Sequence, residues 1–295
     1  MRGGLGLAVC GLALALVLPA GRVAAQDTSS IADLRKAADG GDVAAQLQLG
    51  DAYFDGNGVD EDHAMAAQWY LKAAGQGNAD AETDLGAMYD QGDGVARDYA
   101  ESLMWNRKAA DQGQVRAQYN MGVAYDNGLG VTQDTAQAAI WYRMAADQGY
   151  DEAEFNLGNM YENGDGVAQD YAQALAWYQK AADQGYDPAR YNIGNMYING
   201  EGVAVDEAKG LDLIEQAAGN GLAKAQSRMA TICHDGDYGV ARDPVKAYGW
   251  ALLATDGGDE DASDLIDQMD SANELTDDQK QQASDFADSM DANGQ

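Results

Sequence analysis

Small and apolar residues return along the chain at a constant interval of 36 positions. An alanine opens each copy, an apolar residue or methionine follows four positions later, and a glycine comes next in the first five copies. The opening alanines are Ala45, Ala81, Ala117, Ala153, Ala189 and Ala225. A fixed period in this range indicates stacked supersecondary units, each of which buries its apolar face only against its neighbours. The pattern therefore predicts one elongated repeat domain.

The second copy shows which elements one repeat builds. Ala81, Leu85 and Tyr89 recur at helical spacing and predict a first helix that ends near Gly92. The glycines of the following turn suit backbone angles that residues with a Cβ adopt only at a cost. Asp98 then fits the N-cap of a second helix. Each copy is thus predicted to be an antiparallel helix pair.

Two further features describe how the two helices of a copy pack. Glu101 completes a capping-box spacing after Asp98, and Gly113 fits the position just beyond the end of the second helix. A glycine in the middle of a helix costs roughly 1 kcal/mol relative to alanine. Since Gly86 recurs at this place in five copies, we expect the second helix to approach it closely. One slot of the second helix holds tryptophans that we interpret as core: Trp69, Trp105, Trp141, Trp177 and Trp250.

Taken together, these residues resemble the Sel-1-like repeat, a relative of the tetratricopeptide repeat. The fourth copy carries the pattern nearly throughout, with Ala153, Leu157, Gly158, Tyr161, Gly164, Gly166, Val167, Asp170, Ala174, Trp177, Tyr178, Ala181, Ala182 and Gly185. The resemblance implies an all-α fold, a right-handed superhelical solenoid of antiparallel helix pairs. The sixth copy departs from it, with one extra residue near Gly239 and Cys233 in place of the tyrosine, and the fifth has Leu213 in place of the tryptophan.

The repeats divide the chain into four regions. We expect a signal peptide at 1–25, an N-terminal capping helix at 26–44, six repeats at 45–261, and C-terminal capping helices with a tail at 262–295. The predicted repeats are 45–80, 81–116, 117–152, 153–188, 189–224 and 225–261. Arg2, a short apolar stretch and the small residues before Gln26 are typical of an export signal. The protein is therefore predicted to be periplasmic or secreted, without membrane insertion after cleavage.

Charge narrows the choice of partners. Removal of Arg2 and Arg22 with the leader lowers the count of Lys and Arg from 18 to 16 against 49 Asp and Glu, a formal charge of −33. Such a surface repels nucleic acid and anionic lipid. It favours a basic protein or peptide partner, although solubility alone also explains it. We expect a monomer.

The sequence contains no recognisable catalytic or metal-binding constellation. His63 is expected to be an exposed residue of a first helical turn, and His234 adjoins Cys233 in a spacing unsuited to joint metal ligation. Cys233 is interpreted as a buried, unreactive thiol because it occupies the tyrosine slot. The acidic turns do not match a calcium loop. We therefore predict a non-enzymatic protein without cofactor or metal.

A candidate binding surface lies on the first helices, which line the concave side in related solenoids. The slots left free by the core hold Asn120, Asn156, Asn159, Asn192 and Asn195, with Gln48, Asp51 and Asp84 nearer the N-terminus. Carboxamides donate and accept together, so such a ladder suits the backbone of an extended peptide. A structural role in joining neighbouring repeats remains an alternative. The function indicated is a protein- or peptide-binding scaffold of the cell envelope; a cell-wall glycan-binding protein or an envelope hydrolase is the alternative.

Overall fold

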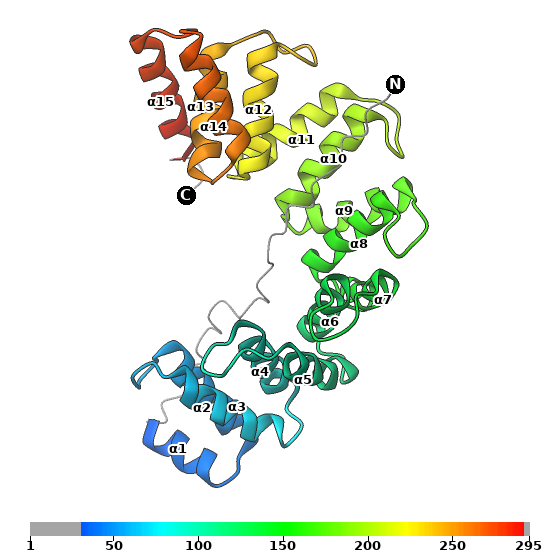
Figure 1. Cartoon of the computed structure of the whole chain (residues 1–295), viewed down its shortest axis with the longest axis vertical. Coiled ribbons are helices and arrows are strands. Elements are labelled where there is room, and N and C mark those ends of the chain that lie inside the picture. The colour runs from blue at the N-terminus through cyan, green and yellow to red at the C-terminus, as the bar shows by residue number, and fades with distance from the viewer. Residues whose placement is uncertain (1–30, 292–295) are drawn as a thin grey trace. The chain divides into compact units, whose positions relative to one another are not determined.

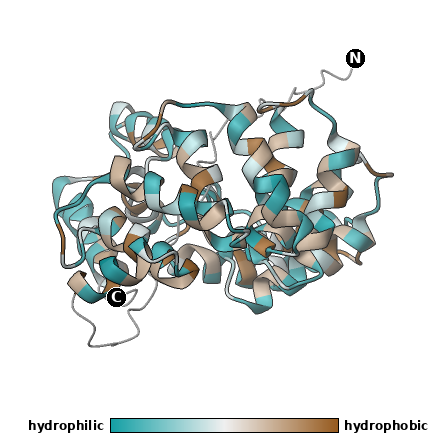
Figure 2. Cartoon of the chain, turned by 90° about the horizontal axis from the view of Figure 1, so that it is seen from below, coloured by the Kyte–Doolittle hydropathy of each residue, from teal (hydrophilic) through white to brown (hydrophobic). Residues whose placement is uncertain are grey.

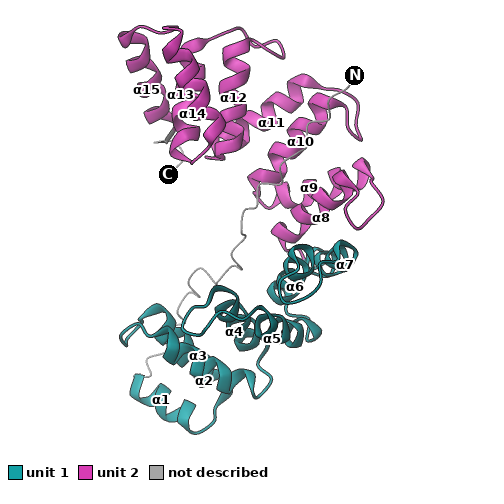
Figure 3. Cartoon of the chain, viewed as in Figure 1, with its two compact units in different colours: residues 1–148 teal, residues 149–295 magenta. Residues whose placement is uncertain are grey.

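The computed structural model of the chain describes residues 31–291, and in this range it contains fifteen helices and no strand (Figure 1). The leader expected at 1–25 and the last residues of the tail lie outside the described residues. Two compact units, residues 1–148 and 149–295, divide the chain (Figure 3). The all-α repeat architecture predicted from the sequence is confirmed.

The first unit consists of one helix followed by three helix pairs. α2 packs against α3, α4 against α5 and α6 against α7, while α3 and α5 also contact the first helix of the next pair. α1 packs against α2 and buries Ala38. The bounds are α1 Ile31–Asp39, α2 Val43–Asp55, α3 His63–Ala74, α4 Ala79–Gln91, α5 Tyr99–Asp111, α6 Val115–Asn127 and α7 Thr135–Ala146.

The second unit repeats this arrangement and ends in two further helices. α8 pairs with α9, α10 with α11 and α12 with α13, and both α14 and α15 pack on α13. The bounds are α8 Asp151–Asn163, α9 Tyr171–Asp183, α10 Asp187–Asn199, α11 Glu207–Gly219, α12 Ala223–Asp235, α13 Pro244–Asp256, α14 Glu260–Ser271 and α15 Asp277–Asp291.

Every second helix begins at its predicted aspartate. The side chains of Asp62, Asp98, Asp134, Asp170, Asp206 and Asp243 each accept a backbone N–H of the first turn. The return bond expected from the side chain of Glu101 does not form. The backbone N–H of Asp98 instead donates to the carbonyl of Tyr89 at 2.9 Å, so this donor is already occupied. Half of the capping box is therefore present.

The glycines within the first helices mark close helix–helix approaches, as predicted. A Cβ built on Gly158 would lie 2.5 Å from the ring of Tyr178, and one on Gly86 would lie 2.5 Å from the carboxamide of Asn106. The turn glycines allow a second close approach, between one repeat and the preceding one. Gly94 has φ +66°, and a Cβ there would lie 2.3 Å from the carbonyl oxygen of His63 in the preceding repeat. Only glycine satisfies both demands without strain.

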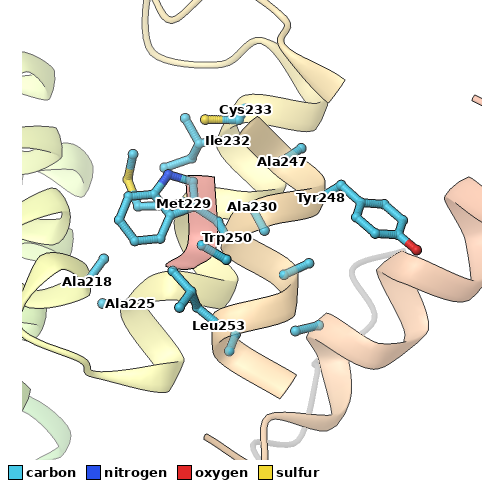
Figure 4. Packing of buried hydrophobic residues seen from close by; sticks show 14 of the residues in the cluster. Ala218, Ala225, Met229, Ala230, Ile232, Cys233, Ala247, Tyr248, Trp250 and Leu253 are labelled. Atoms are coloured by element: carbon cyan, nitrogen blue, oxygen red, sulfur yellow. The ribbon is translucent and has the colours of Figure 1, made fainter. Parts of the chain in front are cut away.

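The core of each unit is a thin band of alanine, aliphatic and aromatic side chains. Hydrophilic and hydrophobic residues are interspersed along the helices (Figure 2). The five tryptophans are only 3–8% exposed, which confirms their place in the core. In the last pair, Trp250 lies on the same side as Met229 and the sulfur of Cys233, whereas Tyr248 points the opposite way (Figure 4).

Candidate functional site

In the second unit, the predicted carboxamides lie half-buried on α8 and α10. The Oδ1 of Asn159 accepts hydrogen bonds from the hydroxyl of Tyr178 at 2.6 Å and from Nδ2 of Asn192 at 3.2 Å. Asn195 donates to the carbonyl of Tyr191, one turn back in its own helix. The carboxamide of Asn156 has no hydrogen-bond partner within residues 31–291. Two of the four therefore join neighbouring repeats, and Asn156 and Asn195 retain bonding capacity toward solvent.

In the first unit, the predicted residues divide between surface and interior. Gln48 is exposed, and Asp51 accepts from the hydroxyl of Tyr70 at 2.9 Å, in the same slots as Asn159 and Tyr178. Asp84 and Asn120 are each 1% exposed. Neither lies on the surface, because each is held by a partner that reaches it inside the unit.

The partners of these two buried groups differ. Asp84 of α4 forms an ion pair with Arg116 of α6, in the next repeat. Asn120 of α6 donates through Nδ2 to Oδ1 of Asn106 at 3.0 Å. Asn106 stands where most repeats have a bulky tyrosine or isoleucine, which explains how a second carboxamide fits there. Asp84 and Asn120 are therefore not part of the exposed surface of the first helices.

A second set of polar side chains, not anticipated from the sequence, links consecutive helices. Gln46 donates to the carbonyl of Ala38 at 3.0 Å and accepts from Nε2 of Gln76 at 2.8 Å. Gln118 makes the corresponding bonds with Ala110 and Gln148. We call Gln46 and Gln118 the bridging glutamines. The available signal was a glutamine directly before the glycine that follows the second helix in each of the first four repeats: Gln76, Gln112, Gln148 and Gln184.

The second repeat has Glu82 in place of the bridging glutamine. Glu82 is 4% exposed and accepts from Nε2 of Gln112 at 2.7 Å, but a carboxylate cannot donate to a carbonyl as Gln46 does. Burial raises the pKa of Glu82 above its ordinary value, and the charge of Lys108 and the bond from Gln112 oppose this only in part. The ionised carboxylate is thus a local cost at neutral pH.

Glu82→Gln is expected to raise the free energy of unfolding at pH 7 by about 1 kcal/mol, because it restores the missing donor. The folded-state pKa of Glu82 is raised, so the wild-type group contributes most at acidic pH, and this contribution is lost as pH rises through that pKa. The gain should therefore shrink as pH falls toward 4. Thermal unfolding from pH 4 to 8 measures it. Glu215→Gln, at an exposed helical position, is the control; an equal gain there would contradict the assignment.

Both histidines lie between two carboxylates rather than in a metal site. Nδ1 of His63 lies 2.5 Å from Oδ1 of Asp93 and its Nε2 lies 3.2 Å from Oε1 of Glu61. The ring of His63 stacks on that of Phe54, with 4.6 Å between the ring centres. His63 is therefore half-buried, and the expectation of an exposed residue is wrong. Partial burial lowers the pKa of His63, but the hydrogen bond and charge of Asp93 outweigh it and raise the pKa overall. His234 contacts Asp235 and Glu274 in the same manner.

Within residues 31–291, no group of three His, Cys, Asp or Glu could hold a metal ion. Cys233 is 3% exposed, and burial followed by the charge of Asp243 raises the pKa of its thiol to about 11. This is the environment of an unreactive thiol. No helix in the described part of the chain is long and apolar enough to cross a bilayer.

Comparison with known proteins places these features in a family. The Sel1 repeat model matches six consecutive segments, 43–78, 79–114, 115–150, 151–186, 187–222 and 223–259. The chain belongs to the Sel1 repeat family. Proteins of this family are generally protein-interaction scaffolds, typically without catalytic activity. No curated protein matches this Sel1 repeat protein.

Two solved structures support the assignment. A Sel1 repeat protein from Oxalobacter formigenes is 38% identical, with a TM-score of 0.71, over 81% of this chain and 69% of that one. A protective antigen of uropathogenic Escherichia coli with an SLR fold is 35% identical, with a TM-score of 0.71, over 88% of this chain. The present chain spans only 58% of that antigen's length.

Proposed function

We propose that this Sel1 repeat protein is an exported, non-catalytic scaffold that binds a protein or peptide along its first helices. The observation that carries the proposal is the pair of half-buried carboxamides on neighbouring first helices, Asn156 on α8 and Asn195 on α10. Neither is used in bonding another repeat. A carboxamide offers a donor and an acceptor to a peptide backbone whatever its side chains. The acidic surface favours a basic partner.

Export is proposed from the leader-like sequence at 1–25, and periplasmic or secreted location follows from it. In the first unit, exposed Gln48 is the corresponding contact. Asn159, Asn192 and Asp51 contribute to the proposed surface chiefly by orienting their neighbours, because their oxygens or amides already bond Tyr178, Tyr70 or one another.

The double variant Asn156→Ala/Asn195→Ala is expected to lose a partner that the wild-type chain retains. The chain from Gln26 to Gln295 is immobilised, exposed to an envelope extract of its source cells, and the retained proteins are identified by mass spectrometry. Two lost hydrogen bonds of about 1 kcal/mol each lower affinity by roughly tenfold or more.

Gln173→Ala/Gln179→Ala, on the exposed side of α9, is the matched control and should retain the partner. Equal retention by both double variants would remove the first-helix surface from the proposal. Retention of peptidoglycan alone would favour the glycan-binding alternative, and release of its fragments during incubation would favour a hydrolase.

A further inference from the structure

The sixth repeat lacks a side chain that the fifth repeat uses to hold a lysine. In the fifth repeat, Nζ of Lys209 donates to the hydroxyl of Tyr197 at 2.6 Å and lies 4.0 Å from the centre of its ring. The ring and the ammonium thus form one unit on the surface of α10 and α11. Cys233 occupies the slot of Tyr197 in the sixth repeat and has neither ring nor hydroxyl.

Backbone bonds establish that the two places are equivalent despite the extra residue in the sixth repeat. Asp206 donates its N–H to the carbonyl of Tyr197, and Asp243 donates to that of Cys233. Both aspartates then cap the N–H of the lysine three positions later, Lys209 and Lys246. Lys246 therefore stands where Lys209 stands. Within residues 31–291 its ammonium has no hydrogen-bond or ion-pair partner.

Beside Cys233 and Lys246, the sixth repeat has a cleft of about 430 Å³. Its apolar wall comes from α12, α13 and α15, and its rim carries charges from α11 and the turn before α13. The lining side chains that bear on a ligand are Met229, Cys233, Lys246, Trp250, Phe286 and Met290. Aromatic rings and methionine sulfurs make favourable contacts with an inserted aromatic ring.

We propose that this cleft is a binding site for a para-substituted phenol, which replaces the missing tyrosine ring and accepts a hydrogen bond from Lys246. The site is separate from the first-helix surface and does not rest on the proposed function. A tyrosine side chain of a protein partner and a free phenol share this chemistry.

The charges around the cleft select a neutral phenol over an aromatic anion. Glu215 and Asp243 also line it, and both oppose the thiolate of Cys233. Arg242, the other cation of the lining, is already paired with Glu274. A carboxylate ligand would meet the same opposition, whereas a phenol oxygen accepts from an ammonium without carrying a full charge. The one lysine at the rim then supplies orientation rather than net attraction.

The test uses p-cresol, the side-chain analogue of tyrosine, and the chain from Gln26 to Gln295 labelled at its methionine methyl groups. We expect p-cresol to shift the Met229 and Met290 signals in a saturable manner, and toluene and p-toluate to bind more weakly. Lys246→Met should weaken p-cresol binding about three- to tenfold, the loss of one hydrogen bond. N-acetyl-tyrosinamide distinguishes the sources: its binding indicates a tyrosine of a partner, and binding of p-cresol alone indicates a free phenol.

Two tyrosine–cysteine exchanges complete the test. Cys233→Tyr restores the residue found in five other repeats and should abolish p-cresol binding while the chain stays folded. Tyr197→Cys should create a second p-cresol site beside Lys209. The proposal is overturned if the wild-type chain does not bind p-cresol, or if folded Cys233→Tyr binds it as well as the wild type. If Cys233→Tyr does not fold, unchanged binding by Lys246→Met together with no second site in Tyr197→Cys overturns it equally.

Discussion

Replacing Gly158 with leucine is expected to lower the free energy of unfolding by about 3 kcal/mol and the Tm by about 5 °C or more. Even a Cβ at this position would lie 2.5 Å from the ring of Tyr178, which is 0% exposed. Tyr178 cannot withdraw freely, because its hydroxyl bonds Asn159 and Glu162. The added side chain must therefore separate α8 from α9. Thermal unfolding followed by circular dichroism measures the effect.

The same leucine on the exposed side of α9, in Ala176→Leu, is the control for helix propensity and surface hydrophobicity. It should leave the Tm within about 1 °C, as surface substitutions usually do. A Gly158→Leu variant as stable as this control would mean that α8 and α9 are not in close contact at Gly158.

Arg116→Ala is expected to destabilise the first unit by about 3–5 kcal/mol, the usual result of removing one member of a buried ion pair. The side chain of Asp84 is 2% exposed and that of Arg116 is 12% exposed, so water cannot replace the guanidinium without opening the contact between α4 and α6. Urea unfolding followed by circular dichroism measures the loss.

Asp84→Asn combined with Arg116→Ala separates the effect of the buried charge of Asp84 from the loss of the packing of Arg116. Asparagine occupies the same slot in the next three repeats, at Asn120, Asn156 and Asn192. The double variant should therefore recover more than half of the stability lost in Arg116→Ala. If the double variant were less stable than Arg116→Ala, the carboxylate of Asp84 would not depend on Arg116 for compensation.

The repeat itself made most of the fold predictable. Asp98 and its equivalents were predicted to cap helices because a carboxylate can accept the free backbone N–H groups at the start of a helix. Gly158 indicated a close helix–helix approach because a glycine within a helix otherwise only lowers its stability. These inferences depend on backbone geometry, which every copy shares. They needed no knowledge of which side chains face each other across repeats.

The candidate surface was less predictable because identical slots have different neighbours. Asp84 is buried since Arg116 reaches it from the next repeat, and Asn120 is buried since Asn106 replaces a larger side chain. The prediction that His63 is exposed failed for the same reason, because its partner Asp93 lies 30 residues later in the sequence, in the next repeat. The 36-residue pattern describes one repeat at a time, so it does not reveal which side chains of neighbouring repeats contact each other.

The bridging glutamines also affect how local unfolding of one helix pair extends to the next in the first unit. Gln46 and Gln118 each connect a first helix to the end of the helix before it and to the end of its own partner. Glu82 makes only the second connection. In a stack whose stability is a sum of nearest-neighbour terms, the interface between α3 and α4 then has one hydrogen bond fewer than the interface between α5 and α6. Local unfolding that begins there separates the first helix pair from the others as a cooperative block.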